Sequence, residues 1–458
     1  MEKYTFESLA EWDREYVWHP FTQMRQYRRE EPLIVERGEG SRLVDVQGRS
    51  YLDGVSSLWV TVHGHNHPRL NSAIKEQIDR VSHSTLLGLA NVPSILLARK
   101  LVEITPPGLN KVFYSDAGAT SVEIAIKMAC QYWRQKDNGQ HRDKTRFVSL
   151  GEAYHGDTVG SVSVGYSELF HTAYRPLLFE SIKIPAPYCY RCPLGESAGS
   201  CRMECLAAAE RVIAENADGI AALVVEPLVQ GAAGMIVQPR GYLSGLAKAC
   251  RRHNILLIAD EVAVGFGRTG TLFACEQEGV CPDLLCTAKG LSGGYLPLAA
   301  TLTTDEVYSA FLGEHREAKT FFHGHTYTGN PLGCAAALEN IRLIEETGLV
   351  ASVREKAAFL ESGLERFSQL PHVGEVRQRG MMVGIELVKE RAGREPYPRE
   401  NSVGHRVTLE ARRRGLITRP LGNVIVLMPI LSMSMEELKQ VLDIAYEAIR
   451  VVTEEASP

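Results

Sequence analysis

Two short, mostly apolar segments of the 458-residue chain lead to charged residues that could do chemistry. Residues 255–259 precede Asp260, and residues 283–287 precede Lys289 after one intervening alanine. Both segments are bounded by turn signals, so we predict two strands that are buried on both faces. Open α/β sheets bind their ligands at the carboxyl ends of the strands. The sequence therefore predicts that a carboxylate and an amine share one crevice.

An amine and a carboxylate in one crevice suit the chemistry of pyridoxal phosphate. Lys289 would hold the cofactor aldehyde as a Schiff base, and Asp260 would keep the pyridine nitrogen protonated. The ring could then accept electrons from a substrate carbanion. The alternative is that Asp260 caps the next helix and that Lys289 is a solvated surface residue. The pair by itself does not exclude this alternative.

Strands that alternate with helices across residues 110–300 predict a mostly parallel sheet with helices on both faces. A small-residue turn at 116–121 separates a strand from a helix, an arrangement that presents N–H groups and a positive helix end to a phosphate. Tyr154 follows another strand, where its ring could lie flat on a cofactor. Thr326, in a glycine-rich loop, could donate its hydroxyl to a phosphate.

We expect three parts in the chain, because 458 residues exceed one small core. Residues 1–90 hold a terminal segment and an antiparallel meander that belong to a small domain and the substrate pocket. Residues 91–334 form the large cofactor-binding domain, and residues 335–458 form a C-terminal α+β domain. In the last part, Arg419 lies in a turn flanked by strands, where it could hold a carboxylate in a bidentate contact. A solvated arginine is the alternative.

Composition limits the classes of partner. A net charge of -5 gives no basic excess, so we expect small-molecule substrates and no nucleic acid. No apolar run approaches the about 20 residues that a membrane span needs, so we expect no membrane partner. The N-terminal stretch lacks the basic and apolar regions of a secretory signal. A cytoplasmic location is the resulting expectation.

Four of the ten cysteines lie close together, with the spacing C-x2-C-x8-C-x3-C. Four thiolates in a cytosolic protein could hold a structural zinc ion. A surface loop with free thiols is the alternative, and the chemistry at Lys289 needs neither, so no metal is assigned to the predicted site. The cysteines are Cys189, Cys192, Cys201 and Cys205.

The pieces together resemble the class III pyridoxal-phosphate aminotransferases, a fold-type-I family of homodimers. The signature-like sequence is LLIADEVAVGFGRTG followed by PDLLCTAKGLSGGYLPLAA, and the likeness covers about residues 17–450. Further motifs resemble the branch of this class that aminates 8-amino-7-oxononanoate to 7,8-diaminononanoate in biotin synthesis. These motifs are WHPFTQM, GVSSLW, SDAGATSVE, AYHGDT, FFHGHTYTGNP and TRPLG. The resemblance implies a mostly parallel sheet in a large domain, with a smaller α+β domain beside it.

The resemblance implies roles for residues around the cofactor. Lys289 would form the Schiff base, and Asp260 would pair with the pyridine nitrogen. The backbone amides of Gly118 and Ala119 would bind the phosphate. Tyr154 would stack on the ring and touch the substrate.

The resemblance also implies an active site shared by two subunits. His325 and Thr326 would reach the phosphate of the cofactor in the neighbouring subunit. Gly324 would line the substrate site, and Arg419 would hold the carboxylate of the long keto acid.

Two substrate-site positions depart from the pattern of the family. Phe21 stands where many members have a tyrosine, and Leu58 stands where some have a tryptophan, which leaves Trp59 as the only indole there. A phenol donor and a large aromatic wall are therefore missing. The amino donor stays open between S-adenosylmethionine, which is usual in the family, and lysine.

Three other functions remain as alternatives. The first is a class III transaminase for another ω-amino acid or a diamine, against which the WHPFTQM segment and the place of Arg419 argue. The second is a mutase or decarboxylase on the same fold, which stoichiometric consumption of an amino acceptor would exclude. The third is a binding or scaffold protein without catalysis, which the intact Lys289 and Asp260 disfavour.

Overall fold

The computed structural model describes residues 4–197 and 199–455 and is built around a seven-stranded sheet. The strand order is β4-β12-β11-β10-β7-β5-β6, and only β12 runs against the other six. The predicted mostly parallel α/β sheet is confirmed. The strands are β4 (Leu109–Ser115), β5 (Arg146–Leu150), β6 (Ile182–Ile184), β7 (Ile220–Val225), β10 (Leu256–Asp260), β11 (Leu284–Thr287) and β12 (Ala299–Thr304).

The central strands are apolar throughout because both faces of the sheet are covered. In β10, Ile258 packs in the cluster formed with helix α6 (Gly118–Gln135), whereas Leu257 packs in the larger cluster on the other face. Both side chains are buried, as expected for strands between two helical layers. In the parallel register of β10 and β11, Asp260 lies opposite Cys286. Asp260 and the residues that follow β11 therefore emerge at the same edge of the sheet.

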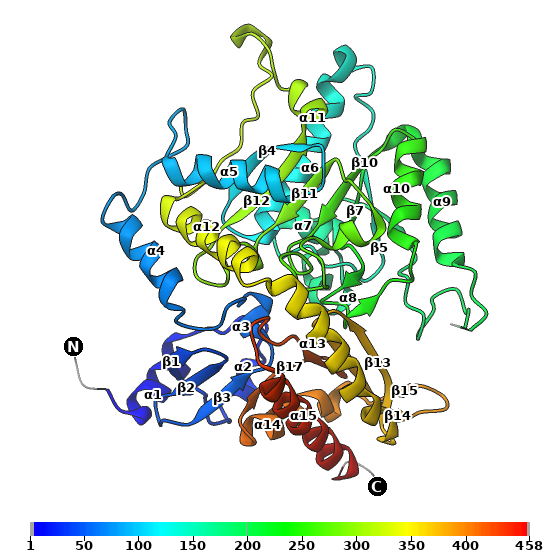
Figure 1. The fold of residues 1–458 in the computed structure, drawn as a ribbon. Helices are drawn as coiled ribbons and strands as arrows, with labels where there is room; N and C mark the ends of the chain where they lie inside the picture. The colour runs from blue at the N-terminus through cyan, green and yellow to red at the C-terminus, as the bar shows by residue number, and fades with distance from the viewer. Residues whose placement is uncertain (1–3, 198, 456–458) are drawn as a thin grey trace.

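The N-terminal and C-terminal parts of the chain lie together below this sheet (Figure 1). The predicted meander forms β1 (Val35–Glu39), β2 (Arg42–Asp45) and β3 (Ser50–Asp53), and β16 (Leu416–Ile417) adds to β3 in parallel. A further sheet holds β13 (Val373–Arg379), β14 (Met382–Glu390), β15 (Glu395–Pro396), β17 (Arg419–Leu421) and β18 (Val424–Leu427). A two-stranded ribbon pairs β8 (Val229–Gln230) with β9 (Ile236–Val237). The division of the chain at residues 90 and 334 stays a prediction.

The helix predicted after the small-residue turn is confirmed as α6, and helices alternate with the strands of the large sheet as predicted. None of the described helices is long and apolar enough to cross a membrane. Besides α6, the helices are α1 (Phe6–Tyr16), α2 (Met24–Tyr27), α3 (Ser56–Trp59), α4 (Pro68–Ile78), α5 (Val92–Ile104), α7 (Val159–Val164), α8 (Glu168–His171), α9 (Glu204–Asn216), α10 (Tyr242–Arg252), α11 (Asp305–Ser309), α12 (Pro331–Glu346), α13 (Leu349–Leu364), α14 (Val403–Arg413) and α15 (Met435–Glu455).

Candidate active site

A cavity of about 700 Å³ opens at the carboxyl ends of the parallel strands. Residues at or after the ends of β4, β5, β7, β10 and β11 line it, as expected for an open α/β sheet. Six of the residues predicted from the sequence to serve the site line this one cavity: Leu58, Gly118, Ala119, Tyr154, Asp260 and Lys289. The tertiary structure thus brings together segments that begin more than 200 residues apart in the chain.

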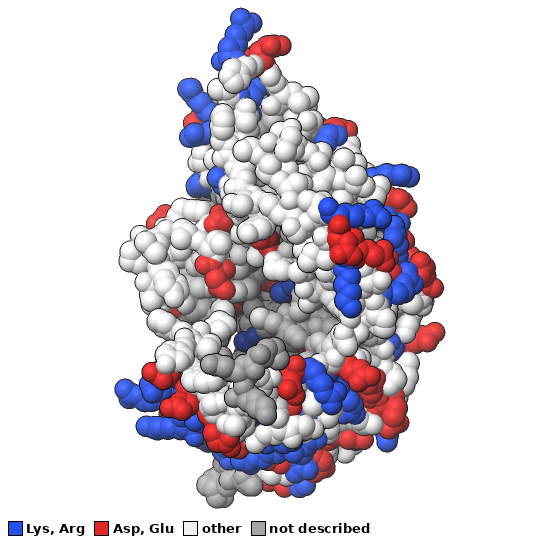
Figure 2. Space-filling model, turned by 90° about the vertical axis from the view of Figure 1, so that its left-hand side faces the viewer, with Lys and Arg blue, Asp and Glu red and all other residues white. Residues whose placement is uncertain are grey.

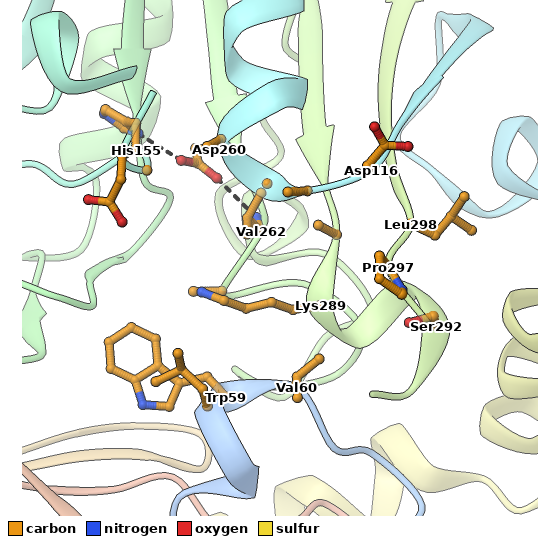
Figure 3. Close-up of a pocket in the computed structure, with 18 of the residues that line it drawn as sticks. Trp59, Val60, Asp116, His155, Asp260, Val262, Lys289, Ser292, Pro297 and Leu298 are labelled. Carbon is orange, nitrogen blue, oxygen red and sulfur yellow. Dashed lines mark hydrogen bonds and ion pairs between the residues drawn. The ribbon is translucent and has the colours of Figure 1, made fainter. Parts of the chain in front are cut away.

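Asp260 is buried at the end of β10 and is held by two partners (Figure 3). Its Oδ2 lies 2.7 Å from Nδ1 of His155, and its Oδ1 accepts a hydrogen bond of 3.1 Å from the N–H of Val262. Because an ionised carboxylate has about four acceptor positions, this leaves capacity for a third donor. The sequence assigned no role to His155, although it follows Tyr154 in the AYHGDT motif.

Lys289 extends between Asp260 and Trp59 (Figure 3). Its Nζ lies 4.9 Å from the centroid of the Trp59 ring. The backbone of Lys289 has φ 44°, a region that costs a non-glycine residue strain and is common at functional sites. Burial lowers the pKa of the amine, against the opposing effect of the Asp260 and Glu226 charges. A lowered pKa increases the fraction of neutral amine, which is the form that attacks a carbonyl group.

A second buried carboxylate, Glu226, also lines the cavity. It accepts hydrogen bonds from the N–H of Tyr154 at 3.2 Å and from the N–H of Gly231 at 2.9 Å. Burial raises the pKa of Glu226 to about 7, in spite of the lowering effect of His155. The carboxyl group therefore fixes the backbone that carries Tyr154.

The N-terminus of α6 borders the cavity and suits an anion. A Cβ atom at Gly118 would lie 2.5 Å from Cγ1 of Val262, so this position admits only glycine without a shift. The first N–H groups of an 18-residue helix lack partners within the helix and carry its positive end. A helix end of this kind next to Lys289 and Asp260 matches the phosphate, aldehyde and ring nitrogen of pyridoxal phosphate.

Tyr154 follows β5 in the chain and lines the cavity. Its hydroxyl donates a hydrogen bond of 2.7 Å to Oδ2 of Asp157. Burial and this hydrogen bond raise the pKa of the phenol, so it stays protonated at neutral pH. Its one O–H is used by Asp157, and its oxygen can still accept a hydrogen bond from a ligand.

Among the described residues, the lining of this cavity does not include the predicted substrate residue Arg419. Arg419 is half-buried in β17 and has no ion-pair partner within the described part of the chain. Burial lowers the pKa of its guanidinium group. Its charge influences the pKa values of both Lys289 and Tyr154, so it lies within electrostatic reach of the cavity.

The glycine-rich loop also lies outside the described lining of the cavity. Nδ1 of His325 is 2.7 Å from Oδ2 of Asp116, which does line it. Gly324 and Thr326 are exposed, and an added Cβ at Gly324 would meet no atom within 4 Å. Within one chain, only His325 of this loop contacts a cavity residue.

Phe21 is 58% exposed, and its ring meets that of Phe170 edge to face at 5.5 Å. Its backbone has φ 51°, which marks a tight local turn. Leu58, by contrast, lines the cavity beside Trp59. Of the two departures from the family pattern, only Leu58 therefore changes the cavity wall of a single chain.

The four clustered cysteines surround a separate small cavity of about 90 Å³. All four are free thiols. Among the described residues, no group of three or more His, Cys, Asp or Glu side chains has the geometry to hold a metal ion. The four cysteines are Cys189, Cys192, Cys201 and Cys205.

Comparison with known proteins assigns this chain to a family. Residues 24–449 match the family model described as "Aminotransferase class-III". The chain belongs to this family. The resemblance inferred from the sequence is therefore confirmed, and the protein is an aminotransferase by descent.

Two similar proteins carry the same name. The adenosylmethionine-8-amino-7-oxononanoate aminotransferase of Geobacter sulfurreducens is 53% identical over 454 residues, which are 99% of this chain and 100% of the relative. The crystal structure of the enzyme of that name from Methanocaldococcus jannaschii is 49% identical, with a TM-score of 0.92 and coverage of 97% of this chain and 98% of that chain.

An aminotransferase with a different name is equally similar in fold. The omega transaminase from Pseudomonas jessenii, solved in complex with PMP, has a TM-score of 0.93 and covers 98% of this chain and 99% of that chain. Its sequence identity is 34%. Fold similarity therefore does not separate the two activities, whereas sequence identity does.

Proposed function

We propose that this aminotransferase transfers an amino group to 8-amino-7-oxononanoate and forms 7,8-diaminononanoate in biotin synthesis. The observation that carries this proposal is the full-length identity of 49% and 53% to two enzymes of that name, against 34% to an omega transaminase of the same fold. The retained WHPFTQM, HGHT and RPLG segments support the same substrate. The cytoplasmic location expected from the sequence stays a prediction.

The catalytic roles follow from the cavity. Pyridoxal phosphate, when bound, supplies an aldehyde for the substrate amine and a ring that accepts electrons. Lys289 would hold it through its amine, Asp260 through the ring nitrogen, and the N–H groups of Gly118 and Ala119 through the phosphate. The Nζ of Lys289 would also serve as the general base that moves a proton to and from the substrate carbon.

The burial of this lysine suits its role as a base. Because burial lowers the pKa of Lys289, a larger fraction of the amine is neutral and able to accept a proton. Asp260 is kept in place by His155 and by the N–H of Val262, so its carboxylate does not turn away when the lysine moves. This arrangement keeps the two reacting groups in fixed positions.

The substrate would lie across the mouth of the cavity. Tyr154 offers its phenol oxygen as a hydrogen-bond acceptor, and Leu58 forms part of the wall. We propose that Arg419 pairs with the carboxylate of the keto acid, since its half-buried cation has no ion-pair partner among the described residues. Phe21 and Gly324 complete the site from its outer side.

We propose that two chains assemble with shared active sites. Apolar side chains that are exposed in one chain include Leu87 at 89% and Phe322 at 79%. The two segments that carry them lie together, since the His83 and Tyr327 rings are 4.8 Å apart. A contiguous apolar area of this kind marks an interface, and Figure 2 shows broad uncharged surface above a hollow on this side. His325 and Thr326 would then serve the neighbouring cofactor.

The amino donor is tested by a half-reaction. The yellow enzyme is mixed separately with S-adenosylmethionine and with lysine, and the loss of the cofactor absorbance is recorded. Bleaching by S-adenosylmethionine alone establishes the usual donor, and bleaching by lysine alone makes Phe21 and Leu58 the first candidates for a donor change. If neither donor bleaches a yellow enzyme, the proposed substrate is refuted and an ω-amine replaces it.

A further inference from the structure

The short helix α8 places two neighbouring side chains against residues with proposed substrate roles. The Phe170 ring meets the Phe21 ring edge to face. The His171 ring lies nearly parallel to the Tyr154 ring, with centroids 6.2 Å apart and planes 14° apart. One helix therefore contacts two separate parts of the expected substrate site.

The contacts of His171 determine which of its nitrogens carries the proton. The residue is 1% exposed, and its Nδ1 accepts a hydrogen bond of 2.9 Å from the N–H of Ser167. A neutral imidazole has one acceptor and one N–H, so the proton lies on Nε2. Burial lowers the pKa of His171, which favours this neutral ring.

The Nε2–H of His171 faces the carboxylate that holds Tyr154. Nε2 lies 3.7 Å from Oδ1 of Asp157 and has no hydrogen-bond partner among the described residues. The other oxygen, Oδ2, accepts the Tyr154 hydroxyl at 2.7 Å. The Asp157 side chain is 52% exposed, so water competes for it. At 3.7 Å this is an electrostatic contact and not a hydrogen bond. A buried N–H that faces one oxygen favours one orientation of the carboxylate and thereby of its hydrogen bond to the phenol.

We propose that His171 is a positioning residue for substrate binding: its Nε2–H steadies the Asp157 carboxylate, which orients the Tyr154 hydroxyl at the cavity. The inference rests on the proposed contact of Tyr154 with substrate. It adds to the site a residue that does not itself touch the substrate. His171 itself does not line the described cavity, and it acts through Asp157.

Three replacements of His171 distinguish the effect of its Nε2–H from the effect of its aromatic ring. His171→Gln keeps an N–H near the place of Nε2, His171→Asn moves it toward the place of Nδ1, and His171→Phe keeps an aromatic ring without it. We expect the KM of the substrate that contacts Tyr154 to rise about 3- to 10-fold in the Phe and Asn variants, the range of one hydrogen bond, and to recover in the Gln variant. Tyr174→Phe, at an exposed position in the same segment, should leave KM unchanged.

A double-mutant cycle with Tyr154→Phe tests whether the effect passes through the hydroxyl. We expect His171→Phe to add no further loss in that background, whereas independent effects multiply. The same cycle is measured without turnover, as the dissociation constant of 8-amino-7-oxononanoate for the holoenzyme by calorimetry. Multiplying effects, or no recovery in a folded His171→Gln, would overturn the inference.

The measurements distinguish an error in the proposed substrate from an error in the proposed role of His171. If the wild-type enzyme neither binds nor converts 8-amino-7-oxononanoate, the proposed function is wrong. The cycle is then measured with whichever amine bleaches the yellow enzyme. Coupling between positions 171 and 154 supports the positioning role with either substrate, and its absence contradicts it.

Discussion

Replacement of Arg419 should weaken the binding of the keto acid without lowering the stability of the fold. The guanidinium group is half-buried in β17, where Arg419 lies opposite Val426 of β18. It has no ion-pair partner among the described residues, and burial lowers its pKa. Because the charged form is disfavoured in the folded chain, the cation reduces stability until a substrate carboxylate compensates it.

The expected magnitude follows from the loss of that carboxylate contact. A hydrogen bond to a charged group contributes about 1.5–3 kcal/mol, which corresponds to a rise of about 10- to 100-fold in KM for the keto acid. Arg419→Met keeps the aliphatic length of the side chain and removes the charge. The melting temperature should therefore stay level or rise, while the KM of the amino donor should stay close to that of the wild type.

Steady-state kinetics with each substrate varied in turn, together with calorimetric melting, measure these quantities. Arg413→Met is the matched control, since the Arg413 side chain is 78% exposed and pairs only with Glu410 on the same helix. It should change neither KM. Equal rises in the KM of both substrates, or a clear fall in melting temperature for Arg419→Met, would refute the assignment of the carboxylate contact.

Other perturbations address the remaining parts of the site. Lys289→Ala should abolish transamination while cofactor binding, followed by absorbance, persists; retained turnover would exclude Lys289 as the catalytic lysine. Gly118→Ala should weaken cofactor binding, because the new Cβ would lie 2.5 Å from Val262, and an unchanged dissociation constant would contradict this close packing. The pKa of Glu226 is raised to about 7 in the fold, so its contribution to stability is complete below its usual pKa of 4.5 and is lost as pH rises through 7. Glu226→Gln should therefore lose less melting temperature than the wild type between pH 5 and 7.5, and parallel pH profiles would argue against the raised pKa.

The sequence alone predicted Asp260 and Lys289 as the reacting pair and correctly indicated the fold class. Continuous apolar runs before Asp260 and Lys289 require burial on both faces, and burial on both faces is characteristic of a parallel sheet covered by helices. The expected position of the site follows from this fold class, because ligands bind at the carboxyl ends of the strands in such sheets. The motif around these residues was also sufficient to indicate the family.

The partners of those residues required the tertiary structure. His155 lies 105 residues before Asp260, and only the packing of β5 beside β7 and β10 brings the two side chains to 2.7 Å. The pairing of β3 with β16 joins opposite ends of the chain in the same way. Side-chain periodicity specifies whether a segment is buried, but it does not specify which distant edge it meets. The order of strands in the sheet therefore decided which side chains lie near Lys289.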